Sequence, residues 1–276
     1  MSHNNQKKIA LINDFTGFGK CSIAVSLPII SALKVQCCPI PTSIFSNHTA
    51  YPEYFFDDYT DKMEEYIHNW KKLNLAFEGI STGFLGDAKQ IEIVKQFIVD
   101  FKNKDTVVIV DPVMGDNGEA YVTYSRDLCN RMKELVECAD IVTPNLTEAC
   151  ILTEVDYTEA NKNDEIIEQM ANDISLFGPK KVVITGINRG EYICNYIFEK
   201  GKISNFIKNK KEGIERSGTG DIFSAIISAD AVNGVDFLES VEKATKFISE
   251  CLIISENRNI PKEDGVCFED ILTTLK

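Results

Sequence analysis

Short apolar runs alternate with helical segments along this 276-residue chain, and this alternation constrains its fold more than any other feature. Thr106–Val110, with the sequence Thr-Val-Val-Ile-Val, is the clearest example of a strand without a polar face. Strands that are apolar throughout belong to parallel sheets with helices on both faces. The pattern therefore predicts an α/β fold, a three-layer α/β/α sandwich with a mostly parallel central sheet, in a single domain over residues 1–276.

The other elements follow from apolar periodicity and from turn residues. Further strands are expected at Lys8–Asn13, Val35–Phe45, Gly79–Phe84, Asp140–Thr143 and Lys181–Thr185, with a hairpin from Glu191–Phe198 and Lys202–Ile207. Pro39 and Pro41 predict an irregular or edge course for the second of these strands. Helices are expected at Ser22–Leu33, Thr60–Leu73, Ala88–Phe101, Ser125–Glu137, Thr147–Thr153, Asp164–Phe177, Asp221–Asn233 and Leu238–Ser255.

Composition narrows the classes of function. The net charge of −13 argues against a surface that binds nucleic acid or an anionic membrane. Nine cysteines, an odd number without a CxxC pair, and only three histidines argue against a zinc cluster and are consistent with free thiols in the cytosol. Residues 1–8 lack the apolar core of a signal peptide, and no run is long enough to span a bilayer. A cytoplasmic location is expected.

The segment Ser217-Gly218-Thr219-Gly220-Asp221 runs directly into an apolar helix. Its glycines allow a tight bend and a close approach of the backbone to a ligand. The first N–H groups of a helix lack internal partners, and with the helix dipole they form an anion site. Asp221 would repel a resting phosphate, but it suits the role of a base that takes a proton from a hydroxyl. An ordinary helix cap with an acidic first turn is the alternative.

Polar residues follow several predicted strands, where ligands of parallel sheets bind. Asp111 and Asp116 follow Thr106–Val110 and could hold magnesium, although acids and glycines are also usual in turns. Asn145 and Glu148 follow the strand that ends at Thr143. They could face a common ligand, and they equally fit a capping box.

Two further segments could contact ligand. Thr185 ends the strand that begins at Lys181 and could contact a phosphate or a ribose. The glycines around Gly17 and Gly19 fail the P-loop pattern, which leaves a loop that can approach a small ligand. His48 lies among polar and aromatic residues that suit a planar heteroaromatic ligand, although a solitary histidine is more often structural.

Together these motifs resemble the ribokinase-like superfamily and, within it, the pyridoxal kinases. The resemblance covers nearly the whole chain. Its most specific match is Gly218-Thr-Gly-Asp221. The other matches are Asn13–Ser22, Phe45-Ser-Asn-His-Thr49, Asp111-Pro-Val-Met-Gly-Asp116 and Thr143-Pro-Asn-Leu-Thr-Glu148. Asp14 stands where the commoner pattern has Ser.

The resemblance implies transfer of the ATP γ-phosphate to the hydroxymethyl oxygen of pyridoxal, pyridoxine or pyridoxamine, in an enzyme that is often a homodimer. By matching position, Asp221 is the base, and the N–H groups of Gly218, Thr219 and Gly220 form the anion hole. Magnesium and a monovalent cation are assigned to Asp111, Asp116, Thr143 and Glu148, and the ATP phosphates to Asn145 and Thr185. The pyridine site is assigned to Asp14, Phe45, His48, Thr49 and Phe84.

The nearest alternative is a hydroxymethylpyrimidine kinase of thiamine synthesis. That relative usually carries Cys at the position of Asp221 and a different segment at Phe45–Thr49, so both features favour pyridoxal. A sugar kinase fits the aromatic cluster less well. A non-catalytic sensor of vitamin B6 or nucleotide on the same fold would be expected to lack the base or to have a broken anion loop, and this chain has both intact.

Overall fold

A computed structural model describes residues 5–121 and 124–275 of the chain. The start of the segment considered above for a signal peptide, including His3, lies outside these residues. Among the described residues, nine strands form one sheet in the order β11-β10-β9-β8-β5-β4-β1-β2-β3. The strands from β9 to β2 in this order are parallel, and β3, β10 and β11 are antiparallel to their neighbours. The predicted fold class is confirmed.

The strands of this sheet are β1 Lys8–Thr16, β2 Gln36–Phe45, β3 Phe56–Asp58, β4 Gly79–Thr82, β5 Val107–Val110, β8 Ile141–Val142, β9 Lys181–Arg189, β10 Tyr192–Glu199 and β11 Asn205–Lys210. A separate two-stranded hairpin consists of β6 Gly115–Asp116 and β7 Glu119–Ala120.

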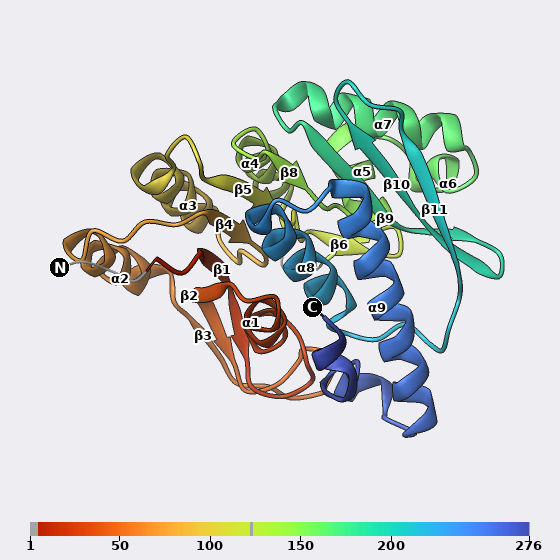
Figure 1. Ribbon diagram of the computed structural model, residues 1–276, viewed down its shortest axis with the longest axis horizontal. Helices are drawn as coiled ribbons and strands as arrows, with labels where there is room; N and C mark the ends of the chain where they lie inside the picture. The colour runs from red at the N-terminus through yellow and green to blue at the C-terminus, as the bar shows by residue number, and fades with distance from the viewer. Residues whose placement is uncertain (1–4, 122–123, 276) are drawn as a thin grey trace.

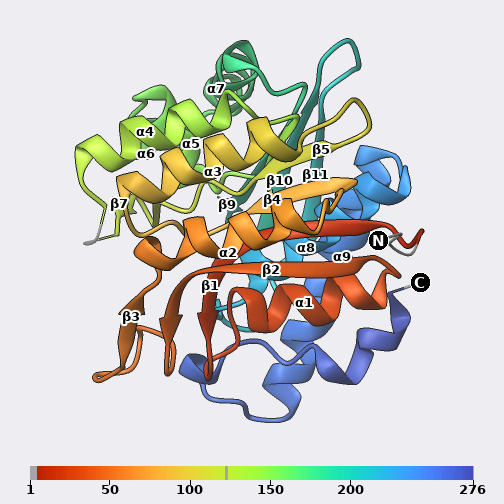
Figure 2. The same cartoon turned by 90° about the vertical axis from the view of Figure 1, so that its left-hand side faces the viewer.

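Helices cover both faces of the sheet (Figures 1 and 2). One face packs against α1 Ile23–Ala32, α8 Thr219–Asn233 and α9 Phe237–Asn257. The other face packs against α2 Thr60–Lys72, α3 Ala88–Phe101, α4 Arg126–Val136, α5 Leu146–Thr153, α6 Tyr157–Ala160 and α7 Asp164–Phe177. Short 3-10 turns at Lys262–Asp264 and Glu269–Thr274 follow α9. None of the helices in the described part of the chain is both long and apolar enough to cross a membrane.

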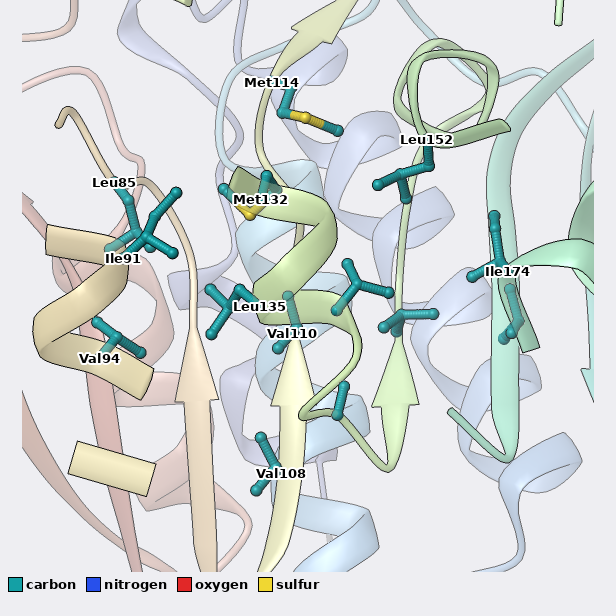
Figure 3. Packing of buried hydrophobic residues seen from close by; sticks show 14 of the residues in the cluster. Leu85, Ile91, Val94, Val108, Val110, Met114, Met132, Leu135, Leu152 and Ile174 are labelled. Carbon is teal, nitrogen blue, oxygen red and sulfur yellow. The ribbon is translucent and has the colours of Figure 1, made fainter. Parts of the chain in front are cut away.

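The apolar strands supply a core on each face. In β1, Ile9 and Leu11 point to the α1–α8–α9 side, while Ala10 and Ile12 point to the other side. Successive side chains of a strand point to opposite faces, so a strand with two apolar faces serves both cores. Figure 3 shows the second core, where Val108 and Val110 of β5 pack beneath side chains of α4 such as Leu135.

One sequence prediction is confirmed by the structure and another is corrected. At Pro39 and Pro41, β2 pairs with β1 alone among the described strands and so forms the edge of the sheet, and its register with β1 shifts just after Pro41. Pro39 and Pro41 are tolerated there because β3 pairs with Ser43–Phe45, beyond both prolines. β9 does not end at Thr185 but continues through Gly186 to Arg189, where it pairs with β10. Antiparallel pairing extends the strand past the parallel part of the sheet.

The strand order places a switch point between β1 and β4. The chain runs from β1 to β2 on one side and later returns to β4 on the other side of β1. A parallel sheet opens a crevice beyond the carboxyl ends of its strands at such a point. The ends of β1, β4, β5 and β8, together with the start of α8, therefore define where a ligand site should lie.

Candidate active site

Asn13 joins the ends of β1 and β4 at the switch point. Its Oδ1 accepts hydrogen bonds from the N–H groups of Asp14, at 2.9 Å, and Phe84, at 2.8 Å. Its Nδ2 donates to Asp221 Oδ1 at 3.4 Å. Only 4% of Asn13 is exposed. This one buried amide thus connects both strand ends to the first turn of α8.

Helix α8 begins at Gly218, whose backbone requires glycine. Its φ is +90°, in the left-handed region, and an added Cβ would lie 2.4 Å from the carbonyl oxygen of Lys20. No side chain caps this helix start. The first N–H groups of the helix are therefore left for other acceptors. A Cβ added at Gly220 would meet nothing within 4 Å, so this side of the turn has room for a ligand.

Asp221 lies in the first turn of α8 and is half-buried. Burial raises the pKa of its carboxyl to about 6, and the nearby charge of Asp14 contributes in the same direction. Hydrogen bonds from the backbone of Ser22 and the side chain of Asn13 oppose the increase. At neutral pH the carboxylate is ionised, and its pKa lies close to the range of an effective general base.

A row of acids continues from Asp221 along the carboxyl ends of the strands. Asp111 follows β5, and its pKa is raised well above the usual value by burial and by the charge of Asp221. The hydroxyls of Thr143 and Ser224 partly offset that increase. Burial and the charge of Asp111 raise the pKa of Glu148 in turn. These carboxylates repel one another, and a bound cation would relieve that repulsion.

Asn145 and Glu148 form the capping box of α5. Asn145 Oδ1 accepts from the N–H of Glu148 at 2.9 Å, and Glu148 Oε2 accepts from the N–H of Asn145 at 2.8 Å. Glu148 Oε1 also accepts from the N–H of Met114 at 3.1 Å, and Asn145 Nδ2 donates to the carbonyl oxygen of Gly115 at 2.8 Å. Both side chains therefore hold the loop after β5 against the start of α5.

The other phosphate-side residues lie around this capping box. Asn145 and Thr185 form an isolated parallel bridge, and the N–H of Thr185 donates to the carbonyl oxygen of Pro144 at 2.9 Å. Asp116 lies in the exposed β6–β7 hairpin, where its carboxylate accepts from the N–H and the side chain of Asn117. Within the described ranges, no three His, Cys, Asp or Glu side chains are arranged to hold a metal ion together.

The predicted ring-binding residues fall into two groups. Asp14 is buried at 4% exposure, and Thr16 Oγ1 donates to its Oδ2 at 2.7 Å. Burial raises the pKa of Asp14. Phe45 ends β2 and Phe84 follows β4, with ring centroids 6.2 Å apart in an edge-on arrangement. Asp14 and these two rings therefore lie beyond neighbouring strands at the same edge of the sheet.

His48 and Thr49 form the second group, on the loop after β2. The His48 N–H donates to the carbonyl oxygen of Phe18, and its Nδ1 accepts from the N–H of Ala50 at 3.2 Å. Burial lowers the pKa of His48, so its ring is neutral at pH 7. Thr49 is exposed. A cavity of about 530 Å³ lies beside this loop, lined by Phe18, Ser46, Asn47, Tyr51, Pro52 and Glu53.

Roles for Asn13, Ser224 and Tyr121 were not predicted from the sequence. Burial raises the pKa of Tyr121, and the charges of four nearby acids, Glu148, Asp116, Asp111 and Asp221, add to that increase. Asn13 is the last residue of a predicted strand, and the rule that ligands bind beyond the ends of parallel strands could have identified it. Ser224 lies one helical turn after Asp221, the spacing that puts two side chains on one face of a helix. Tyr121 had no comparable pattern.

Known proteins resemble this chain both in sequence and in structure. The model of a family described as phosphomethylpyrimidine kinase matches residues 23–266. A hydroxymethylpyrimidine/phosphomethylpyrimidine kinase from Staphylococcus aureus is 28% identical over 191 residues, covering 66% of this chain and 67% of the relative. A Schizosaccharomyces pombe protein described as a putative pyridoxal kinase is 31% identical over 253 residues, which cover 86% of this chain and 78% of the relative.

Solved structures match the whole fold. A Bacteroides thetaiotaomicron protein described as a putative phosphomethylpyrimidine kinase is 35% identical, with a TM-score of 0.96. The match covers 100% of this chain and 96% of the solved one. An orthorhombic form of that description, with pyridoxal, is 34% identical, with a TM-score of 0.94 and coverage of 98% and 96%. Pyridoxal kinase from Lactobacillus plantarum is 22% identical, with a TM-score of 0.90 and coverage of 99% and 97%, which shows a shared fold. The resemblance identified in the sequence is confirmed.

Proposed function

This chain is a kinase of the phosphomethylpyrimidine kinase family, and from that premise we propose that it phosphorylates vitamin B6. The reaction would transfer the γ-phosphoryl group of ATP to the 5′-hydroxymethyl oxygen of pyridoxal, pyridoxine or pyridoxamine. One observation carries the proposal: the half-buried Asp221 carboxylate, with a pKa of about 6, lies in the uncapped first turn of α8. A base and an anion site therefore share one helical turn.

The proposed chemistry uses both parts of that turn. Asp221 takes the proton from the substrate hydroxyl as its oxygen attacks phosphorus. The N–H groups of Gly218, Thr219 and Gly220 stabilise the charge on the transferring phosphoryl oxygens, as helix N-termini do. Phosphoryl transfer depends on positioning and charge stabilisation more than on covalent catalysis. Asn13 holds Asp221 at the end of β1, where the ring of the substrate would lie.

The acidic row fits a magnesium ion bound with the nucleotide. Asp111, Asp116 and Glu148, whose pKa values are raised by burial, would supply negative charge once a cation offset their repulsion, and Thr143 would supply a hydroxyl at the same edge. Hard oxygen ligands of this kind suit magnesium, which usually binds through one or two carboxylates, water and substrate phosphates. When bound, the ion would neutralise charge on the phosphates. Asn145 and Thr185 lie beside this edge, where the phosphates of ATP would pass, and a monovalent cation could share the acidic row.

The ring specificity rests on a different set of residues. Phe45 and Phe84 offer aromatic faces beside Asp14, and His48 offers a neutral imidazole on the adjacent loop. A flat pyridine fits such a site better than a sugar does. The structure with pyridoxal belongs to a protein 34% identical to this chain, which supports the same ring here. Position 221 also supports pyridoxal as the substrate, because this chain has aspartate where hydroxymethylpyrimidine kinases usually have cysteine.

Hydroxymethylpyrimidine is the second candidate substrate. The matching family model is described as phosphomethylpyrimidine kinase, and the Staphylococcus aureus relative as hydroxymethylpyrimidine/phosphomethylpyrimidine kinase. The two rings share a hydroxymethyl group on a flat heteroaromatic ring, so the proposed base and anion site could serve either. The identity of the ring therefore has to be decided by assay.

A coupled ADP-release assay tests the proposal with pyridoxal, pyridoxine, pyridoxamine, hydroxymethylpyrimidine and ribose as acceptors. We expect turnover with the B6 vitamers and a higher kcat/KM for pyridoxal than for hydroxymethylpyrimidine. A preference for hydroxymethylpyrimidine would assign the second candidate. Tight pyridoxal binding with zero turnover would instead indicate a sensor and would overturn the kinase mechanism.

A further inference from the structure

Arg216 directly precedes the glycine loop (Ser217–Gly220) and is buried, with only 6% exposed. Burial of a cation is unfavourable unless its charge and its donors find partners. Arg216 Nη1 donates to the carbonyl oxygens of Ile260, at 2.7 Å, and Pro261, at 2.8 Å. Its Nη2 donates to Glu256 Oε1 at 3.0 Å. All three acceptors come from the end of α9 and the residues just beyond it.

The chain beyond α9 also contacts the glycine loop directly. The N–H of Val266 donates to the carbonyl oxygen of Ser217 at 3.1 Å. Gly265 has a φ of +84°, and a Cβ added there would lie 2.9 Å from Ser217 Oγ. A Cβ added at Gly218 would lie 3.3 Å from Val266 Cγ1. Residues 260–266, which we call the post-α9 segment, thus form one wall of the glycine loop.

The opposite wall belongs to the loop after β1. Ser217 Oγ donates to the carbonyl oxygen of Gly19 at 2.7 Å, and the carbonyl oxygen of Lys20 lies next to Gly218. The glycine loop is therefore held between two irregular segments. Since no side chain caps the start of α8, the contacts of these walls set the direction of its first N–H groups.

We propose that Arg216 is a positioning residue for phosphate binding. Its guanidinium fixes the post-α9 segment against the glycine loop, and so determines where the N–H groups of Gly218, Thr219 and Gly220 point. This inference rests on the proposed function, because those N–H groups matter only if they bind phosphate. Arginine is required because its planar fork serves three acceptors at once, while a lysine ammonium does not reproduce that arrangement.

The test compares Arg216→Ala and Arg216→Lys with Arg258→Ala as the matched control. Arg258 also lies at the end of α9, but its side chain is 56% exposed and pairs with Asp270 at 2.6 Å. Calorimetry measures the dissociation constants of ADP and of pyridoxal separately. We expect Arg216→Ala to weaken ADP binding about tenfold or more, with Arg216→Lys in between, because small displacements of a binding group have large effects.

Pyridoxal binding should be unchanged in all three variants, and millimolar guanidinium should restore part of the ADP affinity of Arg216→Ala. A general loss of folded protein would lower the binding-competent fraction without such a split or such a rescue. If Arg216→Ala does not fold, the ADP affinity of Arg216→Lys decides the question. Unchanged ADP affinity in the folded Arg216 variants, or an equal loss in Arg258→Ala, would overturn the inference.

The outcomes also separate this inference from the proposed function. If the wild-type protein binds ADP but phosphorylates no B6 vitamer, the substrate assignment fails and the comparison of ADP affinities still tests Arg216. If the wild-type protein phosphorylates pyridoxal and the Arg216 variants bind ADP normally, the function stands and the role of Arg216 is wrong. Failure of the wild-type protein to bind ADP would contradict both the proposed kinase function and the proposed role of Arg216.

Discussion

The two ends of the candidate site are built in different ways. At the phosphate end, Glu148 is fixed by N–H groups of the main chain, and Asp221 lies in the first turn of a helix. At the ring end, the loop after β2 carries His48 and the exposed aromatic residues Tyr54 and Phe55. Under the proposed function, the backbone would set the phosphate chemistry, while side chains on a loop would contribute to the choice of ring. This difference would account for relatives of one fold whose descriptions name different rings.

Replacing two glycines of the loop with alanine should change the free energy of unfolding in opposite directions. Gly218→Ala adds a Cβ to a residue at φ +90° and 2.4 Å from a carbonyl oxygen. We expect a loss of about 2–4 kcal/mol in the free energy of unfolding, together with most of the activity. Gly220→Ala has open space and lies within the helix, so we expect a gain of about 0.5–1 kcal/mol. Its Cβ should still lower activity by entering the phosphate site. Denaturant unfolding measures the stability of each variant, and ADP release measures its activity. Equal destabilisation of the two variants would contradict this description of the loop.

Glu148→Gln should weaken both the fold and the response to magnesium. A glutamine amide places donors where Glu148 accepts from the N–H groups of Met114 and Asn145. Leaving a buried N–H without its acceptor costs about 1–3 kcal/mol of stability. The loss of charge should also shift the magnesium activation curve to higher concentration. The control is Glu154→Gln, at the exposed C-cap residue of the same helix. Superimposable magnesium curves for Glu148→Gln and the wild-type protein would remove Glu148 from cation binding.

Asp221→Asn should make the protein more stable at neutral pH. The folded pKa of Asp221 is about 6, above its usual value of 3.8, so the folded state holds the proton more tightly. Protonated Asp221 makes its full contribution to the free energy of unfolding below pH 3.8, and this contribution is lost as the pH rises through about 6. Removing the charge should therefore raise the free energy of unfolding at pH 7 by about 1–3 kcal/mol, less at pH 4. An exposed acid, Asp61→Asn, should show no such gain. A destabilised Asp221→Asn at pH 7 would contradict the assigned pKa.

His48→Asn should give the smallest effect. An asparagine keeps an acceptor for the N–H of Ala50 but removes the imidazole. We expect a rise of about threefold to tenfold in KM for pyridoxal, the size of one lost contact, with KM for ATP unchanged. The control is His68→Gln, on the exposed side of α2. A large fall in kcat would place His48 at the phosphate end and would break the division between the two ends.

Much of the fold was predictable because the parallel strands are buried on both faces and read as apolar runs. The acids after β5 and the glycine loop before α8 were predictable because ligands bind beyond the carboxyl ends of such strands. The capping box was also recognised in the sequence as one of two alternatives, and the structure forms it. The residue types at these positions could not show whether Asn145 and Glu148 also face a ligand.

Other features could not be read from the sequence. The loop after β1 contains Lys20 and Ser22 at φ values of +46° and +58°, which are unusual for residues other than glycine. The second strand of the hairpin, expected at Lys202–Ile207, lies instead at Asn205–Lys210. These outcomes depend on contacts between segments far apart in the sequence, such as Ser217 with Gly19. Local periodicity carries no information about such contacts.

The most direct test of the account is the turnover of Asp221→Asn across pH. A positioned base typically contributes about 10²–10⁴ in rate. We predict that the wild-type kcat/KM for pyridoxal falls as the pH drops below about 6, the pKa of Asp221. Asp221→Asn should bind ADP normally, lose about that factor in kcat and lose this pH dependence. A folded Asp221→Asn that binds ADP and turns over pyridoxal at the wild-type rate would contradict the central claim.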